Sequence, residues 1–163
     1  MGLMTNMDYI VMLRESLEKK VDVLRVLQIR NKEQTVILQN PNATPDELED
    51  NINKKAELID RIVMLDDGFQ QLFDKVKVII EEDRDTYADE IKLMQDLIRR
   101  ITELAADVET SEYKNREYAK AKFAGIKKDA REIKKNSDVV SSYYKSMMSP
   151  ATTADPAFVD KKK

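Results

Sequence analysis

The chain has 163 residues, of which 36% are charged and 6% aromatic, and its net charge is −3. This length suits one domain with a modest core, and the charge content is typical of long helices with solvated outer faces. The sequence contains no Cys and no His, which excludes disulfides, thiolate zinc sites and His-based proton transfer. We therefore expect a non-catalytic protein without a metal or cofactor. The net charge also argues against nucleic acid as a partner of the whole molecule.

The N-terminal sequence MGLMTNMDYI has neither a basic leader nor a long apolar run, so it does not resemble a signal peptide. No window of the sequence approaches the ~20 apolar residues that a membrane span requires. We expect a cytoplasmic protein without a membrane span.

A first helix is predicted over about residues 4–39, because apolar residues recur in steps of four and three. The stripe consists of Leu3, Met7, Ile10, Leu17, Val21 and Leu24, widened by Leu13, Leu27 and Ile29. It weakens through Gln28, Asn31 and Thr35 and recovers at Leu38. Pro41 ends the helix, since proline is not tolerated in a helix interior.

A second helix is predicted over 45–81, and its start is the most specific local signal in the chain. Thr44 is placed as the N-cap, Pro45 in the first turn, and Glu47 completes a capping box. The apolar seam runs through Leu48, Ile52, Lys55, Ile59, Ile62, Asp66, Phe69, Phe73, Val76 and Ile80. Gly68 lies inside this seam and indicates a close helix crossing, a mild kink or a tolerated glycine. The short loop before this helix predicts an antiparallel hairpin.

A third helix is predicted over 86–147. No Gly or Pro lies between Phe69 and Ala124, but one helix from 45 to 147 would be about 150 Å long with its second half uncovered. We therefore expect a turn between Glu81 and Thr86. The fold class is all-α: an antiparallel hairpin and a long third helix form a three-helix, coiled-coil-like bundle over residues 1–148. Residues 149–163 have no periodicity and are expected to be a disordered tail.

The stretch Tyr113–Lys135 is basic, with nine Lys or Arg and three Asp or Glu, while the rest of the chain carries about −9. Three readings of this stretch stay open. It is a solvated helix face, a surface for an acidic protein partner or, less favoured, a nucleic-acid surface.

A thin apolar stripe in the same region lies beyond the reach of the predicted hairpin. An uncovered apolar stripe usually marks an interaction site, filled by a partner's amphipathic helix or by a second copy in a homodimer. The alternative is that this segment folds back as a fourth helix. The expected partner-binding residues are Tyr113, Tyr118, Ala119, Phe123, Ile126, Ala130, Ile133, Val140, Tyr144 and Met147.

Several stretches resemble FlgN-type flagellar export chaperones, especially clostridial forms. They are INKKAELIDRIVMLDDGFQQLFDKVK (52–77), EYKNRE (112–117), the Tyr-Tyr-Lys-Ser-Met sequence from Tyr143, and the final FVDKKK. The order of elements also matches: helix, short Pro loop, helix, long third helix and loose tail. Many relatives have paired Asn residues before the last region, whereas this chain has only Asn115 there.

The resemblance implies a cytosolic chaperone that binds the C-terminal helix of hook-associated (hook–filament junction) proteins. It would prevent their premature assembly and aid their delivery to the export gate. In the family, the C-terminal helix binds cargo and a tyrosine docks to the gate; the candidates here are Tyr113, Tyr118, Tyr143 and Tyr144. The alternative is a structural or adaptor coiled coil that homo-oligomerises through its third helix.

Overall fold

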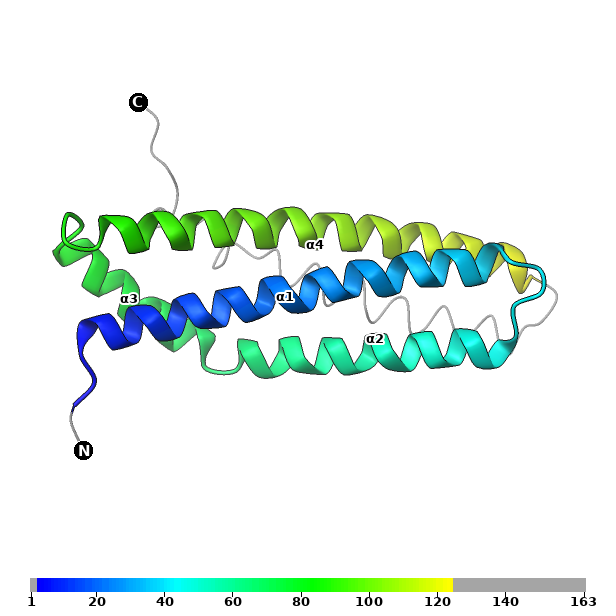
Figure 1. Ribbon diagram of the computed structural model, residues 1–163, viewed down its shortest axis with the longest axis horizontal. Helices are drawn as coiled ribbons and strands as arrows, with labels where there is room; N and C mark the ends of the chain where they lie inside the picture. Colours follow the sequence, from blue (N-terminus) through cyan, green and yellow to red (C-terminus); the bar gives the residue numbers. More distant parts are fainter. Residues whose placement is uncertain (1–2, 125–163) are drawn as a thin grey trace, which may run out of the picture.

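The protein is all-α in the computed structural model, which describes residues 3–124 (Figure 1). The described helices are α1 (Asn6–Gln39), α2 (Pro45–Asp66), α3 (Phe69–Glu82) and α4 (Ala88–Lys122). Within residues 3–124, the expectation of three helices is corrected to four, because the predicted helix 45–81 is divided into α2 and α3. The expected tail, 149–163, lies outside the described residues.

The start of α2 confirms the capping box read from the sequence. The Thr44 hydroxyl accepts a hydrogen bond from the Glu47 backbone N–H at 3.2 Å, and the Glu47 carboxylate accepts one from the Thr44 N–H at 3.1 Å. Pro45 occupies the first turn. Two of the N–H groups that a helix start leaves unpaired are thus satisfied. A second such box, Thr5 with Asp8, begins α1 and was not anticipated.

Gly68 breaks the predicted 45–81 helix. Its φ is +73°, a left-handed conformation that side chains with a Cβ rarely adopt, and no atom lies close to where a Cβ would stand. Glycine is therefore needed at position 68 because of the left-handed backbone conformation, and not because another helix packs closely against it. Lys20 of α1 spans the break, since it pairs with Asp66 and lies 4.8 Å from the Phe69 ring centroid.

The turn between the second and third predicted helices is confirmed. Helix α3 ends at Glu82 and α4 begins at Ala88. Within the turn, the Thr86 hydroxyl donates to the Asp83 carboxylate at 2.6 Å. Asp89 and Glu90 lie in the first turn of α4. Acidic residues are favoured there, because the N-terminus is the positive end of the helix dipole.

Helix α4 ends earlier than predicted, at Lys122 rather than 147. Its end matches the end of α1: the Lys122 ammonium donates to the backbone carbonyls of Ile37 at 3.2 Å and Asn40 at 2.8 Å. These carbonyls also accept from the backbone N–H groups of Asn40 and Ala43, at 3.3 and 3.1 Å. The cation therefore adds a further partner and complements the negative end of the α1 dipole. Beyond this point α1 offers no further surface to pack against.

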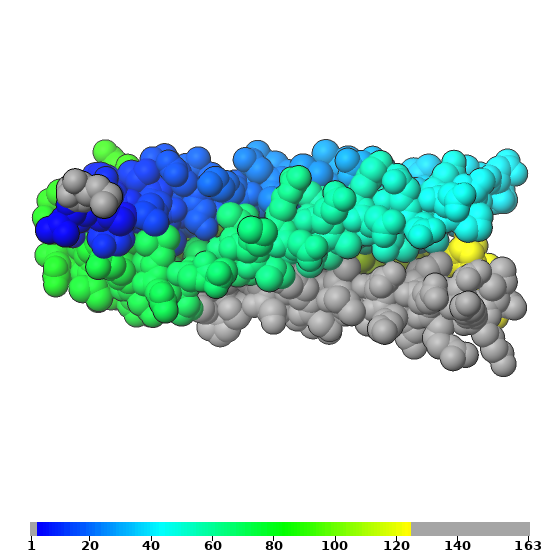
Figure 2. Space-filling model, turned by 90° about the horizontal axis from the view of Figure 1, so that it is seen from below, coloured from blue at the N-terminus to red at the C-terminus, as the bar shows by residue number. Residues whose placement is uncertain are grey.

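Helix α1 is the centre of the arrangement and contacts each of the other three described helices. Helix α4 runs parallel to it, and α2 runs antiparallel on its other side (Figure 1). Figure 2 shows α2 and α3 lying along α1 on one face. The antiparallel α1–α2 hairpin agrees with the sequence prediction.

The buried stripe of α1 keeps steps of three and four along most of the helix. Its seam positions are Ile10, Leu13, Leu17, Lys20, Leu24, Leu27, Asn31, Gln34 and Leu38. On α2, three residues of the predicted seam are buried, Leu48, Lys55 and Ile62, but two other positions are displaced by one residue. Asn51 and Leu58 are buried there, whereas Ile52 and Ile59 are only half-buried.

Candidate partner-binding site

Four of the ten predicted partner-binding residues lie in the described part of the chain. Tyr113 and Tyr118 are on the outer face of α4, 56% and 37% exposed. Ala119 is 4% exposed and packs with Leu38 and Leu48. Phe123 caps α4 and is half-buried against the same cluster.

The expectation of an uncovered stripe is therefore wrong for Ala119 and Phe123. The end of α1 and the start of α2 reach further along α4 than the sequence suggested, so both side chains are covered. The other six predicted residues lie outside the described residues: Ile126, Ala130, Ile133, Val140, Tyr144 and Met147. A binding role for all ten stays a prediction.

Three of the described basic residues near the end of α4 have local partners. The Arg116 guanidinium lies 5.3 Å from the centre of the Tyr113 ring, and Lys120 pairs with Glu117 at 3.3 Å. Lys122 is committed to the carbonyls that end α1. The exposed contacts contribute little to stability and exchange readily, so this face stays available to a partner.

The interior of the bundle changes from apolar to polar side chains near the end of α4. One apolar cluster fills the first two thirds of the α1–α4 contact, and a small one, with Leu38, Leu48 and Ala119, closes the far end. Between them lies a polar layer, formed by Asn31, Gln34, Thr35, Asn51, Lys55, Glu112 and Asn115. The weakening of the first apolar stripe at Asn31 and Thr35 was visible in the sequence, but the meeting of these residues with the others in one layer was not.

Hydrogen bonds in the polar layer join α1 to α4. The Asn115 side-chain amide donates to the backbone carbonyl of Asn31 at 3.0 Å, and the Thr35 hydroxyl donates to the side-chain oxygen (Oδ1) of Asn115 at 2.6 Å. The Asn31 amide donates to the Val108 carbonyl at 3.4 Å. These bonds require particular residues face to face, so they fix the register of the two parallel helices.

A second part of the layer joins α1 to α2. The Gln34 amide donates to the Asn51 side chain at 3.0 Å, and the Asn51 amide donates to the Arg30 carbonyl at 2.8 Å. Lys55 donates to the Gln34 side chain at 3.3 Å.

The Lys55 ammonium also forms an ion pair with Glu112, which connects α2 to α4. Lys55 is 3% exposed and Glu112 is fully buried. Apart from this ion pair, the Glu112 carboxylate makes no hydrogen bond to the described residues. Removing a carboxylate from water is costly unless its lone pairs are satisfied, so the layer stabilises this end less than apolar packing would.

Burial lowers the pKa of the Lys55 ammonium below its ordinary value, and the neighbouring Glu112 opposes this shift only in part. Between the lowered folded pKa and the unfolded value of about 10.4, the unfolded chain binds more protons than the folded one. The free energy of unfolding contributed by Lys55 therefore rises with pH across that window.

We expect urea titrations to show that the stability of the wild type rises relative to that of the neutral double variant Lys55→Met/Glu112→Leu as pH increases from 7 to about 10.5. The double variant is the reference because other Lys and Tyr residues titrate equally in both proteins. A difference that stays constant with pH would show that Lys55 keeps an ordinary pKa.

Within residues 3–124, no group of three or more His, Cys, Asp or Glu side chains is arranged to hold a metal ion. In the same part of the chain, no helix is both long enough and apolar enough to cross a membrane. No protein-family model matches the chain, and comparisons with curated proteins and with solved structures find no match.

Proposed function

We propose that this protein is a cytosolic flagellar export chaperone of the FlgN type, without catalytic activity. It would bind the C-terminal helix of hook-associated proteins, keep that helix from assembling early and aid its delivery to the export gate. The sequence resemblance over 52–77 and 112–117 supports this proposal, as does the all-α fold of the described residues.

The observation that carries the proposal is the change of packing along α4. Up to Val108 the helix is held by large apolar side chains, whereas Glu112 and Asn115 occupy the interior positions that follow. A polar layer with an incompletely satisfied carboxylate holds a helix less strongly than an apolar seam. The end of α4 is therefore the part of the described bundle best suited to rearrange when an amphipathic helix arrives.

The charge distribution also supports cargo binding at the end of α4. Tyr113–Lys135 is basic in an otherwise acidic chain, so an acidic cargo helix would be steered to it. Complementary charge of this kind mainly raises the association rate and improves selectivity. The exposed rings of Tyr113 and Tyr118 add amphipathic contact area.

The test is a calorimetric titration of the full-length chain with C-terminal helical peptides from hook-associated proteins of the same genome. We expect binding that is lost on Ile133→Asp, which introduces a carboxylate into the predicted stripe. Val159→Asp, the same change outside the stripe, is the matched control and should bind as the wild type does.

Two outcomes would contradict the proposal. Equal binding by the Ile133→Asp variant and the wild type would place the cargo surface elsewhere. Absence of peptide binding, together with a mass that rises to a dimer with concentration, would favour the structural coiled coil that homo-oligomerises.

A further inference from the structure

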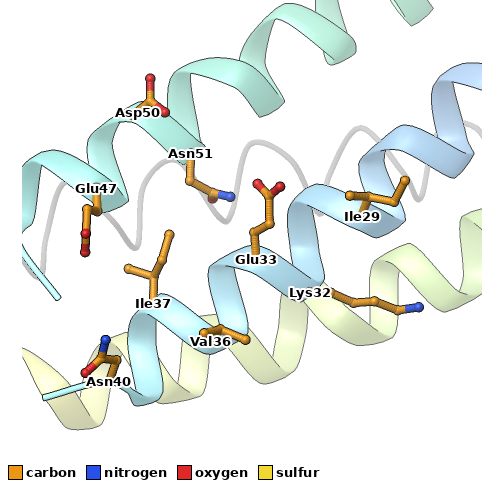
Figure 3. Close-up of a pocket in the computed structure, with 9 residues that line it drawn as sticks. All are labelled: Ile29, Lys32, Glu33, Val36, Ile37, Asn40, Glu47, Asp50 and Asn51. Carbon is orange, nitrogen blue, oxygen red and sulfur yellow. The ribbon is translucent and has the colours of Figure 1, made fainter. Parts of the chain in front are cut away.

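An open groove of about 650 Å³ lies between the second half of α1 and the start of α2 (Figure 3). Its apolar lining comes from Ile29, Val36 and Ile37 of α1. Figure 3 shows Ile37 and Glu33 pointing from α1 toward α2, with Asn51 facing them. The volume falls in the range of about 300–1,000 Å³ that is usual for binding sites.

Two apolar side chains in this groove are left open to solvent. Ile29 is 54% exposed and Val36 is 66% exposed. They are seven residues apart in α1, so two helical turns separate them and they lie on the same side. A helix laid alongside α1 would cover both with apolar residues at the same spacing.

The rim of the groove is acidic. Glu33, Glu47 and Asp50 line it together with one cation, Lys32. Glu33 is also paired at 2.8 Å with Arg30, in a partly exposed pair within α1. Asp50 belongs to the sequence PDELED, which places four carboxylates in the first six residues of α2. Asp50 is paired at 2.9 Å with Lys54, but both side chains are about half exposed. Exposed pairs of this kind are weak, so a partner's cation can replace Lys54.

The polar interior wall of the groove is already satisfied. The Asn51 side chain accepts from Gln34 and donates to the Arg30 carbonyl. A small-molecule site needs a few convergent polar groups that orient the ligand, and Asn51 is engaged elsewhere. The open shape and the exposed apolar positions suit a helix instead.

We propose that this groove binds a basic amphipathic helix of another protein. Apolar side chains of that helix cover Ile29 and Val36, and its Lys or Arg residues lie against Glu33, Glu47 and Asp50. The partner has the opposite charge from the acidic cargo expected at the end of α4. This inference does not rest on the export-chaperone proposal, and either can fail without the other.

The experiment is an NMR titration of the full-length, ¹⁵N-labelled protein with two synthetic helical peptides. Both have Leu at positions spaced by three, four and seven residues; one is flanked by Lys and the other by Glu. We expect the Lys peptide to shift the amide signals of 29–40 and 47–51, and to bind about tenfold more tightly than the Glu peptide.

Matched variants separate the groove from general charge attraction. Val36→Gln should weaken binding of the Lys peptide by about tenfold, since it removes an apolar contact. Val78→Gln makes the same change at a 54% exposed position on α3 and should have no effect. Asp50→Asn should weaken binding more than Glu49→Gln, because Asp50 lines the groove and Glu49 does not.

Equal affinities for the two peptides would overturn the proposal, and so would equal effects of the two Val→Gln variants. Shifts confined to other helices would place the bound peptide outside the groove and also overturn it. Absence of any binding by the full-length protein would have the same consequence.

Discussion

Replacing Glu112 by Leu is expected to lower the free energy of unfolding by about 3–5 kcal/mol. The substitution removes the partner of Lys55, whose ammonium is 3% exposed and has little water to solvate it. Chemical denaturation followed by circular dichroism measures the loss. Replacing Glu103, an exposed carboxylate on the same helix, by Leu should change stability by no more than about 0.5 kcal/mol.

The double variant Lys55→Met/Glu112→Leu tests directly whether the two buried charges are coupled. With both charges removed and the volume roughly kept, stability should return to the wild-type value or exceed it by about 1–4 kcal/mol. The double variant would then be more stable than Glu112→Leu alone, although it carries one more change. If the double variant loses as much stability as the sum of the two single variants, the side chains are not coupled.

Replacing Phe73 by Ala is expected to cost about 3–5 kcal/mol through lost burial and the cavity left behind. Phe73 is 1% exposed and its ring lies 5.9 Å from that of Phe69, so it is the main apolar anchor of the short helix α3. Thermal and urea unfolding measure the loss. Hydrogen exchange should show the largest loss of protection in α3.

The control for this prediction is Val78→Ala on the same helix. Val78 is 54% exposed, and Ala has the higher helix propensity, so stability should stay the same or rise slightly. If Phe73→Ala were as mild as this control, α3 would be a loosely attached element.

The sequence predicted the helix ends that depend on local chemistry. Thr44 and Glu47 form their capping box within four residues, so no distant part of the chain is needed to recognise it. The turn after Glu82 was also predictable, although no Gly or Pro marks it, because an unbroken helix would have left its second half uncovered.

The break at Gly68 was missed for a geometric reason. The spacing Ile62, Asp66, Phe69, Phe73 keeps steps of four and three across the turn, so the apolar pattern reads as one helix. Only the positive φ of Gly68 distinguishes the break from a tolerated glycine, and a backbone angle cannot be read from residue spacing.

The polar layer was missed because apolar patterns were followed and polar residues were treated as gaps. Asn31 and Gln34 keep the three-and-four spacing of α1, and Glu112 and Asn115 keep that of α4. Continuing the seam positions of α1 and α4 would have found these four residues. Their pairing depends on the register of helices far apart in the chain, which no local pattern specifies.

The ion pair between Lys55 and Glu112 also has a consequence for synthesis. The α1–α2 hairpin can form as soon as its residues emerge, but Glu112 is made 57 residues after Lys55. At about 5–20 residues per second this is a wait of roughly 3 to 11 seconds. During that time the nascent hairpin carries a lysine that faces water rather than a carboxylate, so the bundle closes only when α4 is nearly complete.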